Sequence, residues 1–254
     1  MRKSAIFLLF VAFCLTILGL SAQGGIAVSP QTARTKTEAE GKQKPEDSKQ
    51  RPVAKSKVYL LHSDLLRKDA SHPDAQIVTG NVSFRHDSVY MYCDSACYYD
   101  KVSSFEAFGN VKMVQGDTLF LYGDRLYYDG LTQIAEMRCN VRMENRTTTL
   151  LTDSLNYDRV YNLGYFFDGG TLMDEQNVLT SEWGEYSPQT KQSVFNYNVK
   201  LVNPQFTLTS DTLRYNTASK IADIVGPSDI WSDANHIYSE KGTYNTVTLS
   251  LIHI

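Results

Sequence analysis

The sequence predicts an all-β protein: an elongated, V-shaped β jelly-roll (a β-taco) of stacked two-strand repeats, each about 29 residues long. Three observations predict this fold: a recurring tyrosine, acidic and apolar residues that recur with it, and an odd spacing inside each unit. A fixed period of 20–50 residues is typical of stacked structural units. The tyrosines spaced by 29 residues are Tyr99, Tyr128, Tyr157, Tyr186, Tyr215 and Tyr244.

Two further columns follow the tyrosines. An acidic residue lies four positions before every tyrosine except the first, where it is one place out of step. The acidic column is Asp94, Asp124, Asp153, Glu182, Asp211 and Glu240. Three positions before each acid lies an apolar residue, and this column is Met91, Leu121, Leu150, Leu179, Leu208 and Ile237. The repetition therefore covers six units.

The spacing inside a unit predicts a bend. Leu121 and Leu126 are five residues apart, which in a flat strand would place them on opposite faces. A bulge at Gly123–Asp124 would return both halves of the strand to one interior. Glycine and asparagine tolerate the backbone angles of such corners. The matching corners on the partner strands are Gly80–Asn81, Gly109–Asn110, Cys139–Asn140, Asn198 and Gly226.

The acidic column is interpreted as structural. Catalysis needs one or two carboxylates in individual surroundings, whereas these recur in near-equivalent positions. Calcium-binding repeats place several acids in one short loop, which is not the pattern here. We expect each acid to accept backbone N–H groups at its corner. Since the sequence also has no phosphate loop, nucleophile elbow or zinc spacing, it predicts no enzyme, no cofactor and no metal site.

The tyrosine and apolar columns leave two interpretations open. The tyrosines form either a cross-strand ladder with hydroxyls reaching water or the lip of a groove that accepts an amphiphile. The apolar column lines the interior together with Leu126, Leu155 and Leu213, and small residues alternate with these at Ala96, Gly184 and Gly242. This uneven lining predicts room on some rungs. An open interior would admit lipid tails, whereas a filled one would make a structural stalk.

Composition and the two ends set the domain limits. Residues 1–22 are predicted to be a signal peptide, with a retained membrane anchor as the alternative, and residues 23–57 a disordered tether. The repeat domain covers 58–248; we expect 249–254 to be non-native and the natural protein to continue. The net charge of −3, without a basic stripe, argues against a nucleic-acid partner. Beyond the signal, an odd number of cysteines (Cys93, Cys97 and Cys139) excludes a fully paired disulfide framework.

The recurring pattern of Gly-Asn-Val, a short turn, apolar alternation and Asp-x-Leu-x-Tyr-Asp resembles the OstA/LptA-type domain of lipopolysaccharide transport. It is carried by GNVKMVQGDTLFLYGDRLYYD, CNVRMENRTTTLLTDSLNYD and NVKLVNPQFTLTSDTLRYN, and the resemblance covers residues 76–246. The resemblance implies a bent β jelly-roll in the periplasm, whose groove shields the lipid A acyl chains of lipopolysaccharide. It also implies edge-strand pairing with other β jelly-roll modules of a transport bridge, and it leaves association with the outer membrane open.

Our first hypothesis is therefore a non-catalytic lipid-binding conduit. The resemblance does not distinguish a soluble bridge protein from an inner-membrane-anchored member or the periplasmic part of an outer-membrane translocon. The second hypothesis is a structural β-repeat stalk or interaction module with a closed core. A β-helical carbohydrate enzyme would need one rung with an acidic pair unlike its neighbours, and none stands out in the sequence.

Overall fold

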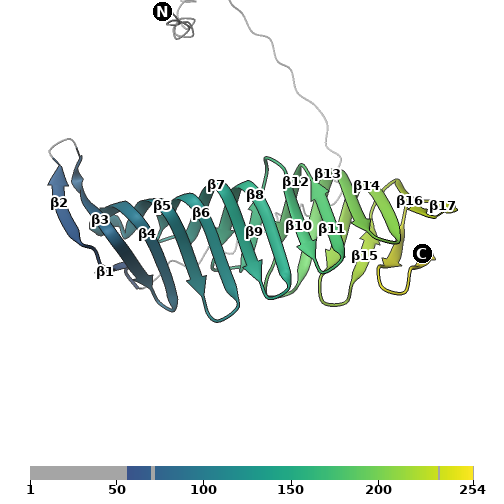
Figure 1. Ribbon diagram of the computed structural model, residues 1–254, viewed down its shortest axis with the longest axis horizontal. Coiled ribbons are helices and arrows are strands. Elements are labelled where there is room, and N and C mark those ends of the chain that lie inside the picture. The colour runs from purple at the N-terminus through teal and green to yellow at the C-terminus, as the bar shows by residue number, and fades with distance from the viewer. Residues whose placement is uncertain (1–55, 70–71, 234, 254) are drawn as a thin grey trace, which may run out of the picture. The chain divides into compact units, whose positions relative to one another are not determined.

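The computed structural model describes residues 56–69, 72–233 and 235–253, which lie in the compact unit Lys49–Ile254. The predicted signal peptide and the predicted tether up to residue 55 lie outside the described residues. Within the described part, 19 strands form one antiparallel sheet, so the all-β prediction is confirmed. Figure 1 shows the strands of this unit lying side by side along its long axis, with β1 and β2 at one end and β16 and β17 at the other.

Eight long strands pass through a corner near their middle. These are β3 (His72–His86), β4 (Val89–Tyr99), β5 (Ser104–Gln115), β6 (Leu119–Asp129), β7 (Ile134–Asn145), β8 (Thr148–Asp158), β13 (Gln192–Asn203) and β14 (Phe206–Asn216). A short 3-10 helix, Asp100–Val102, connects β4 to β5. Successive strands pair antiparallel, with a register shift in the middle of each ladder between long strands.

The register shifts line up and divide the sheet into two walls. In β6, Leu119–Gly123 lies in the first wall and Arg125–Asp129 in the second; the line of shifts between them is here called the crease. Elsewhere the two halves are separate short strands. In the first wall these are β1 (Tyr59–His62), β10 (Gly170–Asp174), β11 (Asn177–Ser181), β16 (Ser228–Ser232) and β17 (Asn235–Ser239). In the second wall they are β2 (Leu65–Asp69), β9 (Leu163–Phe166), β12 (Trp183–Tyr186), β15 (Ile221–Ile224), β18 (Gly242–Asn245) and β19 (Ser250–His253).

The crease is a repeated bulge in which one acidic residue opposes two residues with positive φ. Opposite Asp124, Gly109 and Asn110 have φ of 75° and 45°, and on the other side Cys139 and Asn140 have φ of 64° and 52°. The shift therefore falls where the spacing of Leu121 and Leu126 predicts a bulge, because an extra residue on one strand restores the inward direction of both halves.

The corner acids bond mainly to asparagine side chains. The amide Nδ2 of Asn110 donates to Asp94 Oδ2 at 2.8 Å, and that of Asn140 donates to Asp124 Oδ2 at 2.6 Å. Asn198 donates in the same way to Glu182. The sequence predicts a backbone N–H donor at each corner acid, but among the described residues one is found at Asp153 alone, which accepts from the N–H of Asn140 at 3.2 Å, so this prediction is wrong for the other five acids. The asparagine thus serves twice, by adopting positive φ and by bonding the acid across the crease.

Substitution of Gly109 tests the crease. In Gly109→Ala the new Cβ would lie 2.4 Å from Asp94 Oδ2, at a φ of +75° that costs a non-glycine residue roughly 1–2 kcal/mol. Gly116 has φ +61° with nothing within 4 Å of a Cβ, so Gly116→Ala carries only the backbone cost. We expect urea denaturation to give a loss of stability at Gly109 that exceeds the loss at Gly116 by about 1 kcal/mol or more. Equal losses would show that the packing of acid against glycine contributes nothing.

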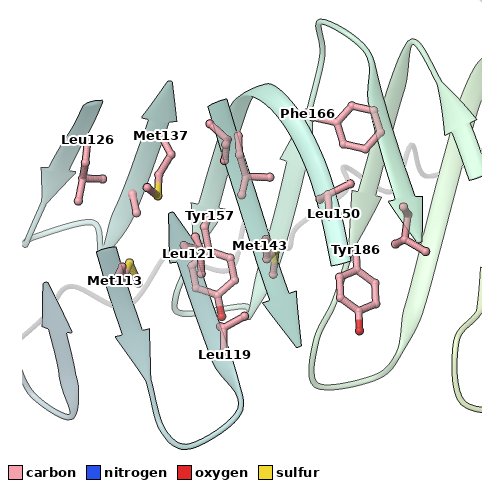
Figure 2. Close-up of a cluster of buried hydrophobic side chains, with 14 of the residues drawn as sticks. Met113, Leu119, Leu121, Leu126, Met137, Met143, Leu150, Tyr157, Phe166 and Tyr186 are labelled. Carbon is pink, nitrogen blue, oxygen red and sulfur yellow. The ribbon is translucent and has the colours of Figure 1, made fainter. Parts of the chain in front are cut away.

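The core lies between the two walls. Leu119 and Leu121 point inward from the first wall, and Leu126 and Tyr128 from the second, and all four are buried. The Phe84 ring of the first wall stacks on the Phe105 ring of the second with centroids 4.2 Å apart. Figure 2 shows side chains from both walls, including Met113, Met137 and Met143, within one cluster. Apolar packing between the walls therefore runs along the stack.

Candidate functional site

The apolar interior is the candidate site, and the first wall supplies its most regular column. Five of the six predicted residues point inward and are at most 1% exposed: Met91, Leu121, Leu150, Leu179 and Leu208. The sixth, Ile237, is 40% exposed, so its placement in the buried lining is wrong. Ile237 pairs with Ile230, but β17 has no further strand beside it among the described residues, which leaves one side of Ile237 uncovered.

The second wall is filled where the sequence predicts room. Leu126, Leu155 and Leu213 are buried as expected for a lining. At Gly184, however, the Phe166 ring occupies the space: an added Cβ would lie 2.6 Å from Phe166 Cζ. At Gly242 an added Cβ would lie 2.9 Å from the carbonyl oxygen of Ile252 in β19. The small residues therefore accommodate neighbouring groups, and the prediction of room at these two rungs is wrong.

The tyrosine column lies inside the protein. Five of the predicted tyrosines are at most 2% exposed: Tyr128, Tyr157, Tyr186, Tyr215 and Tyr244. In the first unit the structure corrects the prediction, because Tyr98 is buried in the column and Tyr99 is not. Tyr98 and Tyr128 both pair with Phe105. The shift arises because the β5–β6 turn has three residues, 116–118, whereas the β7–β8 turn has two, 146–147.

The tyrosine hydroxyls point toward the side of the sheet opposite the crease, where the hairpin turns of the two walls lie close together. We call this side the mouth. The ladder interpretation of the sequence places these hydroxyls in water, but the structure places several of them against polar side chains. Tyr128 Oη is hydrogen-bonded to Nδ1 of the buried His86 at 2.7 Å, and the Arg159 guanidinium donates to Tyr128 Oη. Burial raises the pKa of Tyr128 to about 12, opposed by Arg159.

A second polar network closes the mouth farther along. The carboxylate of Asp174, which is fully buried, accepts from Lys220 Nζ at 2.7 Å and from Tyr215 Oη at 2.8 Å. Asn177 in turn donates to Tyr215 Oη at 2.8 Å and to Thr246 Oγ1 at 3.2 Å. Asp174 and Asn177 come from the first wall, and Lys220, Tyr215 and Thr246 from the second. Side chains therefore link the walls here.

Between these networks lie two further cross-mouth contacts. Gln115 Nε2 of the first wall donates to Asn162 Oδ1 of the second at 2.9 Å, and Tyr157 Oη donates to the same oxygen at 3.2 Å. Lys191 Nζ of the second wall donates to Asn145 Oδ1 of the first. In the described residues the mouth is thus a line of side-chain contacts, whereas the crease is continuous backbone.

His86 makes the stability of the mouth depend on pH. Burial, and then the positive charge of Arg159, lowers the pKa of His86 below its usual 6.5. As the pH falls, the unfolded chain therefore takes up a proton on His86 before the folded chain does, which favours unfolding. The contribution of neutral His86 to the free energy of unfolding is therefore complete above about pH 6.5 and is lost at lower pH. We expect His86→Gln to reduce the loss of stability between pH 7.5 and 5.5, measured by urea denaturation at both values. The exposed His62 gives the control His62→Gln, and a wild-type pH dependence in His86→Gln would contradict the assignment.

The polar residues of the mouth are not among those predicted from the sequence, although the sequence carries a signal for them. Asn145, Asp174 and Asn203 are spaced by 29 residues. A second series at the same spacing ends the turns of the second wall, and each member has positive φ: Gln133, Asn162, Lys191 and Lys220. Polar residues in turns are usually exposed to solvent, so the 29-residue spacing alone does not indicate that the two series face each other across the mouth.

The remaining chemistry of the described residues is limited. No group of three or more His, Cys, Asp or Glu side chains that could hold a metal ion occurs among them. Cys93, Cys97 and Cys139 are free thiols, and burial raises the pKa of Cys93 to about 12. The part of the chain that the structure describes contains no helix with the length and apolar character that crossing a membrane requires. A hollow of 530 Å³ lies along the crease near Arg142, Leu151 and Asp153, which are all exposed.

These features define a class: an antiparallel β-repeat protein with a bent sheet, an apolar interior and a polar mouth. A family model described as "OstA-like protein" matches residues 55–211, more than half of the chain. The chain belongs to the OstA-like protein family, which confirms the family resemblance read from the sequence.

The other comparisons are distant. Among solved structures the chain is similar to LptH from Pseudomonas aeruginosa, described as the LptA-homologous periplasmic component of the conserved lipopolysaccharide transport device. The two share 8% identity over 63% of this chain and 76% of that one, with a TM-score of 0.17. The curated proteins contain no match to it.

Proposed function

We propose that this protein is a non-catalytic periplasmic lipid carrier that shields the acyl chains of lipopolysaccharide between its two walls on the way to the outer membrane. The observation that carries the proposal is the asymmetry of the bent sheet. The walls are joined along the crease by continuous strands and along the mouth by side chains, while the core packed between them is formed mainly by apolar side chains. Membership of the OstA-like family supports the same proposal.

The energetics favour entry through the mouth. Side chains fill the interior, so acyl chains need the walls to part. Parting them exposes apolar surface, but inserted acyl chains cover that surface again, and each buried methylene contributes roughly 0.8 kcal/mol. The remaining cost is the set of hydrogen bonds at the mouth, such as Gln115–Asn162 and Lys191–Asn145, whose groups can bond water once exposed.

The partners follow from the sheet edges. Leu65 and Leu66 of β2 are exposed, and β2 pairs only with β3 among the described residues. An exposed apolar edge strand is a template for pairing with another sheet. We infer that other β jelly-roll modules pair with such edges, which would extend the apolar interior from one module to the next.

A structural stalk is the second candidate, and the filled interior favours it. Phe166 and the buried leucines leave the core packed in the manner of an ordinary structural repeat. Such a stalk would hold its walls together permanently, and no acyl chain would come between them.

Displacement of a fluorescent fatty-acid probe tests the proposed function. We expect the purified full chain to bind the probe saturably, because the probe inserts between the walls. Lipopolysaccharide should displace the probe, whereas its delipidated polysaccharide should not. Equal displacement by both, or no saturable binding, would overturn lipid shielding and favour the stalk.

A further inference from the structure

Three cations from the second wall line the mouth, and they differ in their partners. Lys220 is neutralised, since its Nζ lies 2.7 Å from Asp174 and 3.2 Å from Glu175. Arg159 and Lys191 are partly buried, and within the described residues neither has a carboxylate oxygen within ion-pair distance. Burying a charge without a counter-charge is costly. The absence of a counter-charge beside Arg159 and Lys191 therefore needs an explanation, whereas Lys220 has its counter-charge in Asp174.

The Arg159 guanidinium has hydrogen-bond donors that are not fully used. Its guanidinium donates to Tyr128 Oη, contacts His86 Nδ1 at 3.1 Å and donates to the backbone carbonyl oxygen of His86 at 3.4 Å. Its Nε is buried and has no hydrogen-bond partner in the structure. All these partners are neutral groups. A guanidinium placed in this way suits an oxyanion better than the groups it now touches.

Lys191 is in a similar position one repeat away. Its Nζ donates to Asn145 Oδ1, an amide rather than a carboxylate. Burial, and then the neighbouring cation Arg146, lowers the pKa of Lys191. Arg146 is exposed and has φ +57° in the two-residue turn next to Asn145. Two cations thus face the same part of the mouth from opposite walls.

Nearby carboxylates are engaged elsewhere. Asp158 Oδ1 accepts the backbone N–H groups of Val160 and Tyr161, at 2.9 and 3.2 Å. Asp87 Oδ1 accepts from Ser56 Oγ at 2.5 Å and Asp87 Oδ2 lies 3.7 Å from His86 Nε2. Arg159 follows β8 and Lys191 precedes β13, and β9 and β12 lie between these two strands, so the two cations lie three strand spacings, roughly 14 Å, apart and would hold separate phosphate groups.

We propose that Arg159, Lys191 and Arg146 form a binding site for the phosphate groups of an acylated amphiphile, at the mouth of the interior that would hold its acyl chains. This inference rests on the proposed function and adds the chemistry of the headgroup. When the walls part, the cations exchange their neutral partners for phosphate oxygens, and the freed amide of Asn145 bonds water. Phosphate binding thereby offsets the loss of the contacts that keep the mouth closed.

Calorimetric titration of the full chain tests this site with three probes: dihexanoyl phosphatidic acid, dihexanoyl phosphatidylcholine and inorganic phosphate. In Arg159→Gln and in Lys191→Gln, affinity for phosphatidic acid should fall by about tenfold or more, since each loses a charge-assisted hydrogen bond. Affinity for the zwitterionic lipid should change less than twofold. Lys191→Arg should restore binding, and Lys200→Gln, which removes an exposed cation outside the mouth, should have no effect. Unchanged thermal unfolding of Lys191→Gln verifies that it folds.

The outcomes separate the two proposals. Wild-type chain that binds both lipids, with affinities that the two glutamine variants leave unchanged, would overturn the headgroup site and leave acyl shielding intact. Wild-type chain that takes up neither lipid would overturn the proposed function itself. Inorganic phosphate that binds as tightly as phosphatidic acid would identify a site for free phosphate and contradict a lipid headgroup.

Discussion

Replacing Phe166 with alanine is expected to lower the free energy of unfolding by about 3–5 kcal/mol, the usual cost of emptying a buried phenylalanine site. The ring is fully buried, and it fills the space above both Gly170 and Gly184, where an added Cβ would come within 2.6 Å of it. Two glycines cannot relax to fill the void, because they have no side chains to move. The loss should therefore lie toward the upper end, as measured by urea denaturation.

The next residue supplies a matched control. Phe167 is 45% exposed and its ring lies 5.6 Å from the Arg138 guanidinium, so Phe167→Ala should cost less than about 1 kcal/mol. Similar losses in Phe166→Ala and Phe167→Ala would contradict the assignment of Phe166 as the residue that fills the interior at this rung. Phe166→Leu should recover part of the loss, because it restores volume without the ring.

Lys220→Met should be nearly as damaging, with an expected loss of about 3–5 kcal/mol, because it leaves the fully buried carboxylate of Asp174 without its cation. Tyr215 and Thr148 still donate to Asp174, but neutral hydroxyls do not balance its charge. The measurement is again the free energy of unfolding in urea.

A double-mutant cycle separates the ion pair from packing. Asp174→Asn combined with Lys220→Met removes both charges, so the double variant should be more stable than Lys220→Met alone. Lys101→Met, which breaks an exposed pair with Asp74, should have almost no effect. Strictly additive losses in the cycle would show that Asp174 and Lys220 do not act as a pair at the mouth.

The sequence predicts the course of the backbone better than it predicts the side-chain contacts at the mouth. The all-β class and the position of the crease follow from local rules: alternation within Leu119–Leu121, the odd offset to Leu126, and Gly-Asn pairs that adopt positive φ. Each of these rules depends on a few adjacent residues. Because the pattern repeats every 29 residues, the strand and corner positions found in one unit predict those of the other units.

Features that depend on contacts between distant units were not predictable in the same way. Tyr98 replaces Tyr99 in the tyrosine column because one turn, at 116–118, holds an extra residue, which a fixed step of 29 cannot register. Phe166 fills the gap at Gly184 from a neighbouring strand. The contacts at the mouth join residues 46 and 47 positions apart, as in Asp174–Lys220 and Gln115–Asn162, and these partners come from opposite walls.

Site-specific photo-crosslinking in cells tests the central proposal most directly. Leu150 is 1% exposed and points between the walls, whereas its neighbour Leu151 is 37% exposed on the outer face. A photoreactive amino acid at 150, and likewise at Leu179, should crosslink to lipopolysaccharide, and the same amino acid at 151 should not. Lipopolysaccharide captured from positions 150 and 179, but not from 151, would support acyl chains between the walls. Crosslinks from 150 and 179 that join only the protein to itself would contradict lipid carriage and leave a structural stalk.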